Sequence, residues 1–143
     1  MMKLPEDVPD CMVFLLAKAY QKAHAQFKKQ LKPYGLTNLQ HLVLEALWYR
    51  QGMTASMLCR SLILDKATLS GTIDRMIKGG WIEKKRSTED KRQFALFTSR
   101  KADTLKDILV KVRIETNTDL LKKFSMEEKI LLKRFLMDII DTE

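Results

Sequence analysis

The chain contains little cysteine, proline or glycine: 2, 3 and 5 residues out of 143. The two cysteines, Cys11 and Cys59, are too few for a disulfide framework and lack the spacing of metal ligands. No apolar run approaches the roughly 20 residues that a membrane span requires. Pro5 and Pro9, with acidic residues between them, interrupt any signal-peptide pattern. We therefore expect a cytoplasmic protein with no metal, no cofactor and no membrane partner.

Residue patterns typical of enzymes are also missing. Two histidines, His24 and His41, and scattered carboxylates form no catalytic triad and no metal cluster, and there is no glycine-rich phosphate loop. We predict that the chain is not an enzyme.

Acidic residues are scarce in one particular stretch. The whole chain has a net charge of +8, and between Arg75 and Lys101 there are nine Lys and Arg against three Asp and Glu. Residues 102–143 have eight basic and nine acidic residues. Basic charge gathered on one segment of a balanced scaffold favours a polyanion as the partner over a uniformly solvated surface.

The N-terminal part predicts two helices. Apolar residues recur at steps of three and four between about Pro9 and Pro33, with Val13, Leu16, Tyr20, Ala23, Phe27 and Leu31 on one stripe. A second apolar set makes this stripe wider than one small domain usually covers, which indicates that a second chain covers it. Thr37 and Gln40 have the spacing of a capping box, so a second helix is expected to about Arg50.

Residues 54–98 predict two short helices and a hairpin. The first helix covers Thr54 to Ser61, and Asp65 is the expected N-cap of the second. On that second helix one face is apolar, and Gly79 and Gly80 end it. Residues 81–86 and 93–98 alternate like strands on either side of a charged turn.

Two further helices complete the chain. One is expected from about Ser99 to Lys123, and the other begins at a second capping box, Ser125 to Glu128. The predicted fold class is therefore mainly α with a small β-hairpin wing. It is a winged helix-turn-helix with long N- and C-terminal helices, an arrangement that can lay a helix in the DNA major groove.

Several residues in this order resemble the MarR family of transcriptional regulators. They are Leu36-Thr37 with Gln40 and Leu44, Leu64-Asp65 with Thr68, Ser70, Asp74 and Arg75, Gly80-Trp81-Ile82-Glu83, Arg86, Asp90 with Arg92, and Phe97-Thr98 with Ala102. The resemblance covers nearly the whole chain. Two residues depart from the family pattern, because Lys101 stands where Gly is frequent and Phe97 where Leu is frequent. Lys101 requires the backbone there to avoid a positive φ.

The resemblance implies one domain, residues 1–143. Helices at about 9–33 and 99–141 would form a homodimer, and about 37–98 would form the DNA-binding lobe. It further implies a repressor that binds a palindromic operator and is released by a small ligand or by thiol oxidation.

The exposed face of the helix after Asp65 supplies candidate groove contacts. These are Lys66, Thr68, Ser70, Gly71, Arg75 and Lys78. Hydroxyl groups can meet donors or acceptors on base edges, and Arg75 could bind a guanine with two hydrogen bonds. Asp74 is expected to orient a neighbouring arginine, since phosphates repel a carboxylate. The alternative is an ordinary solvent-facing helix.

The hairpin supplies the candidate wing contacts. They are Lys84, Lys85, Arg86, Asp90, Lys91 and Arg92. By the resemblance, Arg92 reaches the minor groove or its phosphates, and Asp90 holds the basic side chains in position. A narrow minor groove concentrates negative potential, and arginine loses its hydration more readily than lysine. An adaptor that binds only proteins would leave this turn less basic.

The signal that the protein senses has two candidate sites in the sequence. Tyr20, His24, Tyr34, His41 and Trp48 could line a pocket for an aromatic acid between the first two helices and the dimerisation helices. Alternatively, Cys11 or Cys59 could sense oxidants, as an N-terminal-helix cysteine does in some family members. In those members the cysteine lies near the position of Val13, and Phe27 here replaces one of the tyrosines that serve it. We expect Cys11 to be incidental, Cys59 to be buried, and a ligand to be the signal.

Overall fold

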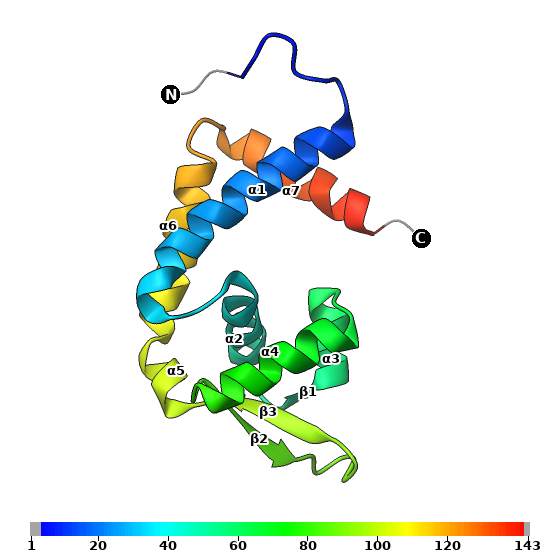
Figure 1. The fold of residues 1–143 in the computed structure, drawn as a ribbon, viewed down its shortest axis with the longest axis vertical. Helices are drawn as coiled ribbons and strands as arrows, with labels where there is room; N and C mark the ends of the chain where they lie inside the picture. The colour runs from blue at the N-terminus through cyan, green and yellow to red at the C-terminus, as the bar shows by residue number, and fades with distance from the viewer. Residues whose placement is uncertain (1–3, 142–143) are drawn as a thin grey trace.

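The computed structural model describes residues 4–141, so the first three and last two residues of the predicted domain lie outside it. Its helices and strands separate into two parts (Figure 1). One part contains α1 (Met12–Leu31), α6 (Lys106–Leu120) and α7 (Met126–Ile140), and α1 packs along α6. The other part contains α2 (Asn38–Tyr49), α3 (Ala55–Leu62), α4 (Lys66–Lys78) and a small sheet. From their places in Figure 1, the first is called the upper part and the second the lower part.

The sheet is antiparallel and has the order β1-β3-β2. Its strands are β1 (Met53–Thr54), β2 (Ile82–Arg86) and β3 (Phe94–Thr98). β2 and β3 form the predicted hairpin, with Ile82 opposite Thr98 and Arg86 opposite Phe94. The predicted fold class, mainly helical with a β-hairpin wing, is confirmed.

Side chains at the helix starts explain where the helices begin. Thr37 and Ser125 both form the predicted capping boxes, with Gln40 and Glu128 as their partners. A short helical turn, η1 (Lys32–Tyr34), follows α1 and ends at Gly35, whose φ of 69° is the left-handed conformation that glycine adopts most easily. α1 itself begins at Met12 rather than at about Pro9, and it ends before Pro33 as expected.

The core lies mainly in the lower part and extends to the base of α6. Its fully buried side chains include Leu44, Leu47, Leu58, Leu69 and Met76 from the lower helices, Leu31 from α1 and Leu109 from α6. β1 was not predicted, because a strand of two residues has no alternation to detect. It fixes the loop after α2 to the hairpin by pairing Met53 with Leu96.

The helix predicted from Ser99 to Lys123 is interrupted. α5 (Arg100–Thr104) and α6 are separated at Leu105, where φ is −95° and ψ is 0°. Asp103 is held to the lower part, because its Oδ1 accepts hydrogen bonds from Trp48 Nε1 (2.9 Å) and Thr98 Oγ1 (2.6 Å). α6 instead packs against α1, so the chain changes direction between these two attachments.

Lys101 lies inside α5 and needs no positive φ, as expected for this residue. Its Nζ lies 4.2 Å from the centroid of the Trp81 ring and donates a hydrogen bond to the Gly79 carbonyl oxygen at 3.1 Å. The lysine therefore links α5 to the end of α4.

Candidate nucleic-acid interface

α4 begins at a cap formed by Asp65. One carboxylate oxygen accepts the Thr68 N–H at 2.8 Å, and the other accepts the Thr68 hydroxyl at 2.7 Å. These hydrogen bonds from Thr68 lower the pKa of Asp65, because they stabilise the carboxylate. The hydroxyl hydrogen of Thr68 is used in the cap, so this predicted contact residue can meet DNA only as an acceptor.

Buried apolar side chains and exposed polar side chains occupy different faces of α4, as predicted. Leu69, Ile73 and Met76 are buried, whereas the candidate residues Lys66, Ser70, Arg75 and Lys78 are exposed. The exposed row joins hydroxyl and cationic groups on one side of a capped helix. It has the chemistry needed to read base edges and bind phosphates.

Arg75 lies back along its own helix. Its Nη2 donates to the Thr72 hydroxyl at 3.4 Å, and a Cβ at Gly71 would meet its Nη1 at 3.4 Å. That is an ordinary van der Waals distance, so the arginine side chain lies against Gly71. Among residues 4–141, Asp74 forms no ion pair, so the expectation that it orients a neighbouring arginine is wrong for this structure.

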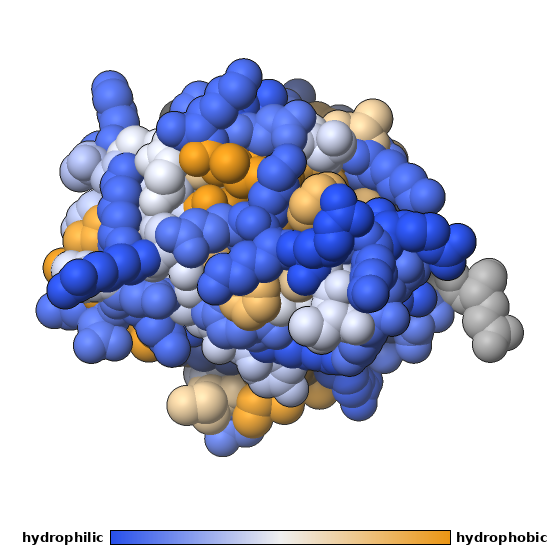
Figure 2. Space-filling view, turned by 90° about the horizontal axis from the view of Figure 1, so that it is seen from below, coloured by the Kyte–Doolittle hydropathy of each residue, from blue (hydrophilic) through white to orange (hydrophobic). Residues whose placement is uncertain are grey.

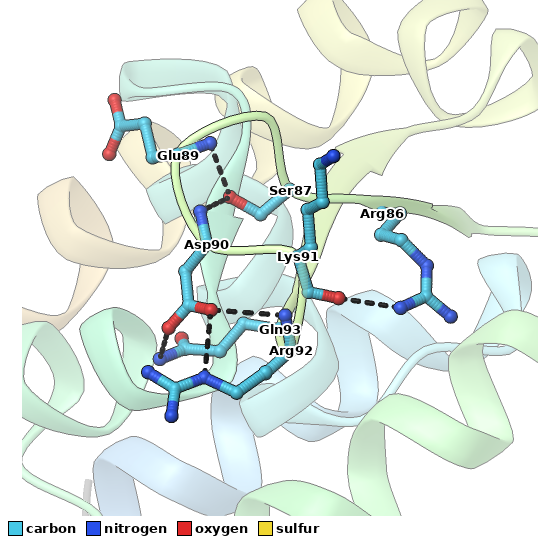
Figure 3. Close-up of polar contacts among 7 residues, drawn as sticks. All are labelled: Arg86, Ser87, Glu89, Asp90, Lys91, Arg92 and Gln93. Carbon is cyan, nitrogen blue, oxygen red and sulfur yellow. Dashed lines mark hydrogen bonds and ion pairs between the residues drawn. The ribbon is translucent and has the colours of Figure 1, made fainter.

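Asp90 organises the wing turn (Figure 3). Its Oδ1 accepts hydrogen bonds from Arg92 N at 3.0 Å and from Arg92 Nε at 3.2 Å, and its Oδ2 accepts one from Gln93 Nε2 at 3.4 Å. The hydrogen bonds from Arg92 lower the pKa of Asp90, so the carboxylate stays charged at neutral pH. Asp90 thus holds Arg92, whose side chain is 90% exposed, which agrees for this one residue with the role that the resemblance implied.

The other basic wing residues differ in their surroundings. Arg86 donates from Nη1 to the Lys91 carbonyl oxygen at 2.6 Å, whereas the Nζ atoms of Lys84 and Lys85 lie over the rings of Phe94 and Phe97. Phe94 was not among the predicted site residues, although it is 45% exposed on the inner side of the hairpin. Strand alternation could have placed it there, because it is two residues before the buried Leu96.

α4 and the hairpin border one groove of about 460 Å³, which also touches α3. Its apolar floor includes Leu69, Ile73 and Leu96, and its polar rim includes Lys66, Ser70 and Lys84. Figure 2 views the molecule from this end and shows mostly hydrophilic side chains with small apolar patches between them. The predicted helix and wing contacts therefore meet at one cationic end of the molecule.

Comparison with known proteins identifies the family. The MarR family model matches residues 36–94. The organic hydroperoxide resistance transcriptional regulator of Bacillus subtilis is 31% identical over 132 residues, which cover 92% of this chain and 88% of that protein.

The chain belongs to the MarR family. It is a transcriptional regulator with a DNA-binding winged helix, and its relatives are regulators rather than enzymes. Two solved MarR-type structures share its fold. BpsR of Bordetella bronchiseptica has a TM-score of 0.89 at 20% identity and covers 98% of this chain and 100% of its own. A mutant of E. coli MarR in complex with operator DNA has a TM-score of 0.83 at 21% identity and covers 90% of this chain and 92% of its own.

The residues predicted to line an effector pocket in this MarR-family chain lie on α1, η1 and α2. Tyr20 and His24 are neighbours on α1, with ring centroids 5.4 Å apart, and Tyr34 lies in η1. Trp48 lies near the other end of α2, where it bonds to Asp103. Neither the groove of about 460 Å³ nor a second, smaller cavity of about 310 Å³ beside the wing is lined by any of the five.

His41, the fifth of these residues, is fully buried between the two parts of the MarR-family fold. Its Nε2 lies 3.1 Å from the Leu109 carbonyl oxygen, and the Phe27 ring packs edge-on against it at 5.0 Å. Arg113 Nε donates to Glu45 Oε1 at 2.7 Å, and that oxygen lies 3.6 Å from His41 Nε2. Burial lowers the pKa of His41, so the ring is neutral at pH 7. This cluster joins α2 to α6.

The two cysteines lie in different parts of the molecule. Cys11 is exposed immediately before α1, and Cys59 on α3 is half-buried at the groove, less buried than we expected. Neither thiol has a hydrogen-bond partner within the described range 4–141. No helix of that range is long and apolar enough to cross a membrane.

Proposed function

We propose that the protein is a homodimeric repressor that binds a palindromic operator, with α4 in the major groove and the wing on the minor groove and backbone. One observation carries this proposal. Lys66 and Ser70 of the exposed α4 row and Lys84 of the cationic wing line the same groove, at one end of the molecule (Figure 1). A neighbour with the same fold has been solved in complex with operator DNA, which supports DNA as the partner.

Exposed apolar side chains support the homodimer. α7 has no buried residue, and Ile130, Leu131, Phe135 and Leu136 are each more than a third exposed. On α1, Val13 and Tyr20 of the predicted stripe are exposed as well. A second copy would cover these faces, since contiguous apolar surface of this kind is rare on monomers.

Selection of binding sites from a random-sequence duplex pool tests the proposal. We expect an enriched palindrome whose half-sites are about 10 base pairs apart, as a two-fold dimer requires. A reporter gene with this sequence in its promoter should be repressed when the protein is produced. Enrichment of a sequence without two-fold symmetry would contradict the dimeric operator complex.

Two substitutions separate the roles of helix and wing. Arg92→Ala should weaken binding to most sequences alike, because its proposed contacts are to the backbone and minor groove. Arg75→Ala should weaken the free energy of binding to the preferred operator by about 1–3 kcal/mol, and the preference should be lost mainly at one base pair. Wild-type affinity in Arg92→Ala would show that the wing assignment is wrong.

For the signal, we propose a small amphipathic ligand in the groove between α3, α4 and the wing. The groove has an apolar floor, and Lys66 and Lys84 at its rim can pair with an acid. A ligand there would compete with DNA for α4. The BpsR structure concerns regulation of DNA binding by 6-hydroxynicotinic acid, which supports an aromatic acid as the class.

Thiol oxidation is the second candidate, favoured by the similarity to a regulator of organic hydroperoxide resistance. A Cys11→Ser, Cys59→Ser double variant distinguishes the two. If peroxide releases wild-type protein from DNA but not the double variant, oxidation is the signal. If peroxide releases neither and an aromatic acid releases both, the ligand is the signal.

A further inference from the structure

The wing turn is closed by its own backbone. Ser87 N–H donates to the Gln93 carbonyl oxygen at 2.9 Å, and Gln93 N–H donates to the Asp90 carbonyl oxygen at 3.0 Å. The Ser87 hydroxyl oxygen accepts the N–H groups of Glu89 and Asp90, both at 3.3 Å (Figure 3). Residues 87–93 therefore form an ordered turn before any DNA is bound.

Arg86 spans this turn from one strand to the other. It is the last residue of β2, and its Nη1 reaches the carbonyl oxygen of Lys91 at 2.6 Å, five residues further along the chain. Its guanidinium carbon also lies 5.6 Å from the ring centroid of Phe94, the residue opposite it in the hairpin. A charged donor to a carbonyl is stronger than a neutral one, and an arginine over an aromatic face adds a cation–π attraction.

Among the described residues, the neighbouring lysines donate no hydrogen bond of this kind. Lys84 lies over the same Phe94 ring at 4.9 Å, yet its Nζ has no hydrogen-bond acceptor among the described residues, and the same holds for Lys91. Arg86 therefore differs from Lys84 and Lys91, because one of its guanidinium N–H groups is bound to a backbone carbonyl oxygen of the wing turn.

We infer that Arg86 is a positioning residue. It holds Lys91 and Arg92 in place for DNA, with Phe94 supporting it, and makes no phosphate contact of its own. A turn that is already ordered loses less conformational freedom when DNA binds, so bracing increases affinity for all sequences alike. This inference rests on the proposed contact between wing and DNA, and it changes the role that the sequence suggested for Arg86.

The first test needs no DNA. Hydrogen exchange of the Ser87 and Gln93 amides is compared in wild type, Arg86→Met and the matched control Lys84→Met, which removes the same charge from the same strand. We expect exchange about tenfold faster or more in Arg86→Met and unchanged in Lys84→Met. If these amides exchange in Arg86→Met at the wild-type rate, Arg86 does not hold the turn in place. Far-UV circular dichroism checks that each variant is folded.

The second test measures affinity for one duplex over a range of salt concentrations. Lys84→Met should make the slope of log affinity against log salt shallower by about one per wing, because a phosphate contact is lost. Arg86→Met should weaken binding about three- to tenfold at every salt concentration, with less than half that change in slope. Phe94→Leu removes the ring over which both Arg86 and Lys84 lie, so it should weaken binding at least as much as Arg86→Met, and Phe94→Trp should keep wild-type affinity because it retains an aromatic face.

A change in slope as large as that of Lys84→Met would mean that Arg86 itself contacts a phosphate. If Arg92→Ala and Lys84→Met both bind as wild type does, the proposed wing contact is wrong. The exchange measurement still decides whether Arg86 braces the turn, so the two failures are distinguishable.

Discussion

His41 has two ring nitrogens in different surroundings. Nε2 faces the Leu109 carbonyl oxygen, which can only accept, so this nitrogen carries the hydrogen of the neutral ring. Nδ1 is buried and has no hydrogen-bond partner among the described residues. The charged groups nearby are Glu45 on α2 and Arg113 on α6, which act in opposite directions on the pKa, and burial outweighs both. Protonation would add a second buried N–H and a charge.

Acid should therefore destabilise the protein through His41. Its pKa in the folded state lies below the usual 6.5, so the unfolded chain takes up the proton first as the pH falls. This destabilisation is absent above pH 6.5. Below that pH, it lowers the free energy of unfolding by up to about 1.4 kcal/mol for each pH unit, until the folded pKa is reached. Urea unfolding at pH 7.5 and 5.5 should show a smaller loss in His41→Gln than in wild type. His24→Gln is the control, and an equal loss in all three proteins would refute the assignment.

At the scale of an element, α4 depends on the residue before it. Asp65 uses both carboxylate oxygens on Thr68, so the first turn of the proposed recognition helix has a fixed start. Lys66 and Ser70 both lie within or next to that turn. Any fraying there would move candidate DNA contacts without disturbing the buried residues Ile73 and Met76 further along.

Asp65→Ala should lower the melting temperature by about 2–4 °C, the usual effect of losing an N-cap in a domain of this size. Affinity for DNA should fall severalfold, because the first turn must be ordered again on binding. Calorimetry and a duplex titration provide the two measurements. Asp65→Ser can also cap the helix, so it should retain most of the melting temperature and of the affinity for DNA. If the serine and alanine variants lose both quantities equally, capping is not the cause.

The elements that local chemistry specifies were predictable from the sequence. Thr37, Asp65 and Ser125 mark helix starts through side-chain hydrogen bonds to nearby amides, and these pairs are three residues apart. The break at Leu105 was not predictable, because it depends on Asp103 meeting Trp48, 55 residues away. The positioning role proposed for Arg86 was not predictable for the same reason. Its charge was evident in the sequence, but the carbonyl that it binds is defined only when the hairpin folds.

At the scale of the whole molecule, the two parts of the chain have surfaces of different character. The lower part ends in the cationic wing and α4, and the upper part exposes apolar side chains on α1, α6 and α7. A dimer through the upper part would leave both lower ends free to contact one duplex. Contacts to about 8–12 phosphates would then give a slope of log affinity against log salt of about −7 to −11.

The double variant Leu131→Lys, Phe135→Lys places two charges on one exposed face of α7. We expect monomers in sedimentation at micromolar concentration and loss of palindrome binding, because buried like charges would oppose association. Lys133→Ala on the same helix should remain dimeric. A dimer that survives both lysines would exclude α7 from the interface.

The break at Leu105 lies between two attachments, Asp103 on α5 and the cluster of His41, Glu45 and Arg113 that joins α6 to α2. On one side, Asp103 fastens α5 to the wing strand and α2, and on the other, α6 runs for 15 residues along the upper part. That helix is about 22 Å long at 1.5 Å per residue, so a rotation of about 10° at Leu105 displaces its far end by about 4 Å. In a two-fold assembly the displacement occurs in both copies. In the proposed dimer, a bend at Leu105 that breaks the Arg113–Glu45 ion pair would therefore change the separation of the two α4 helices by more than the length of a hydrogen bond.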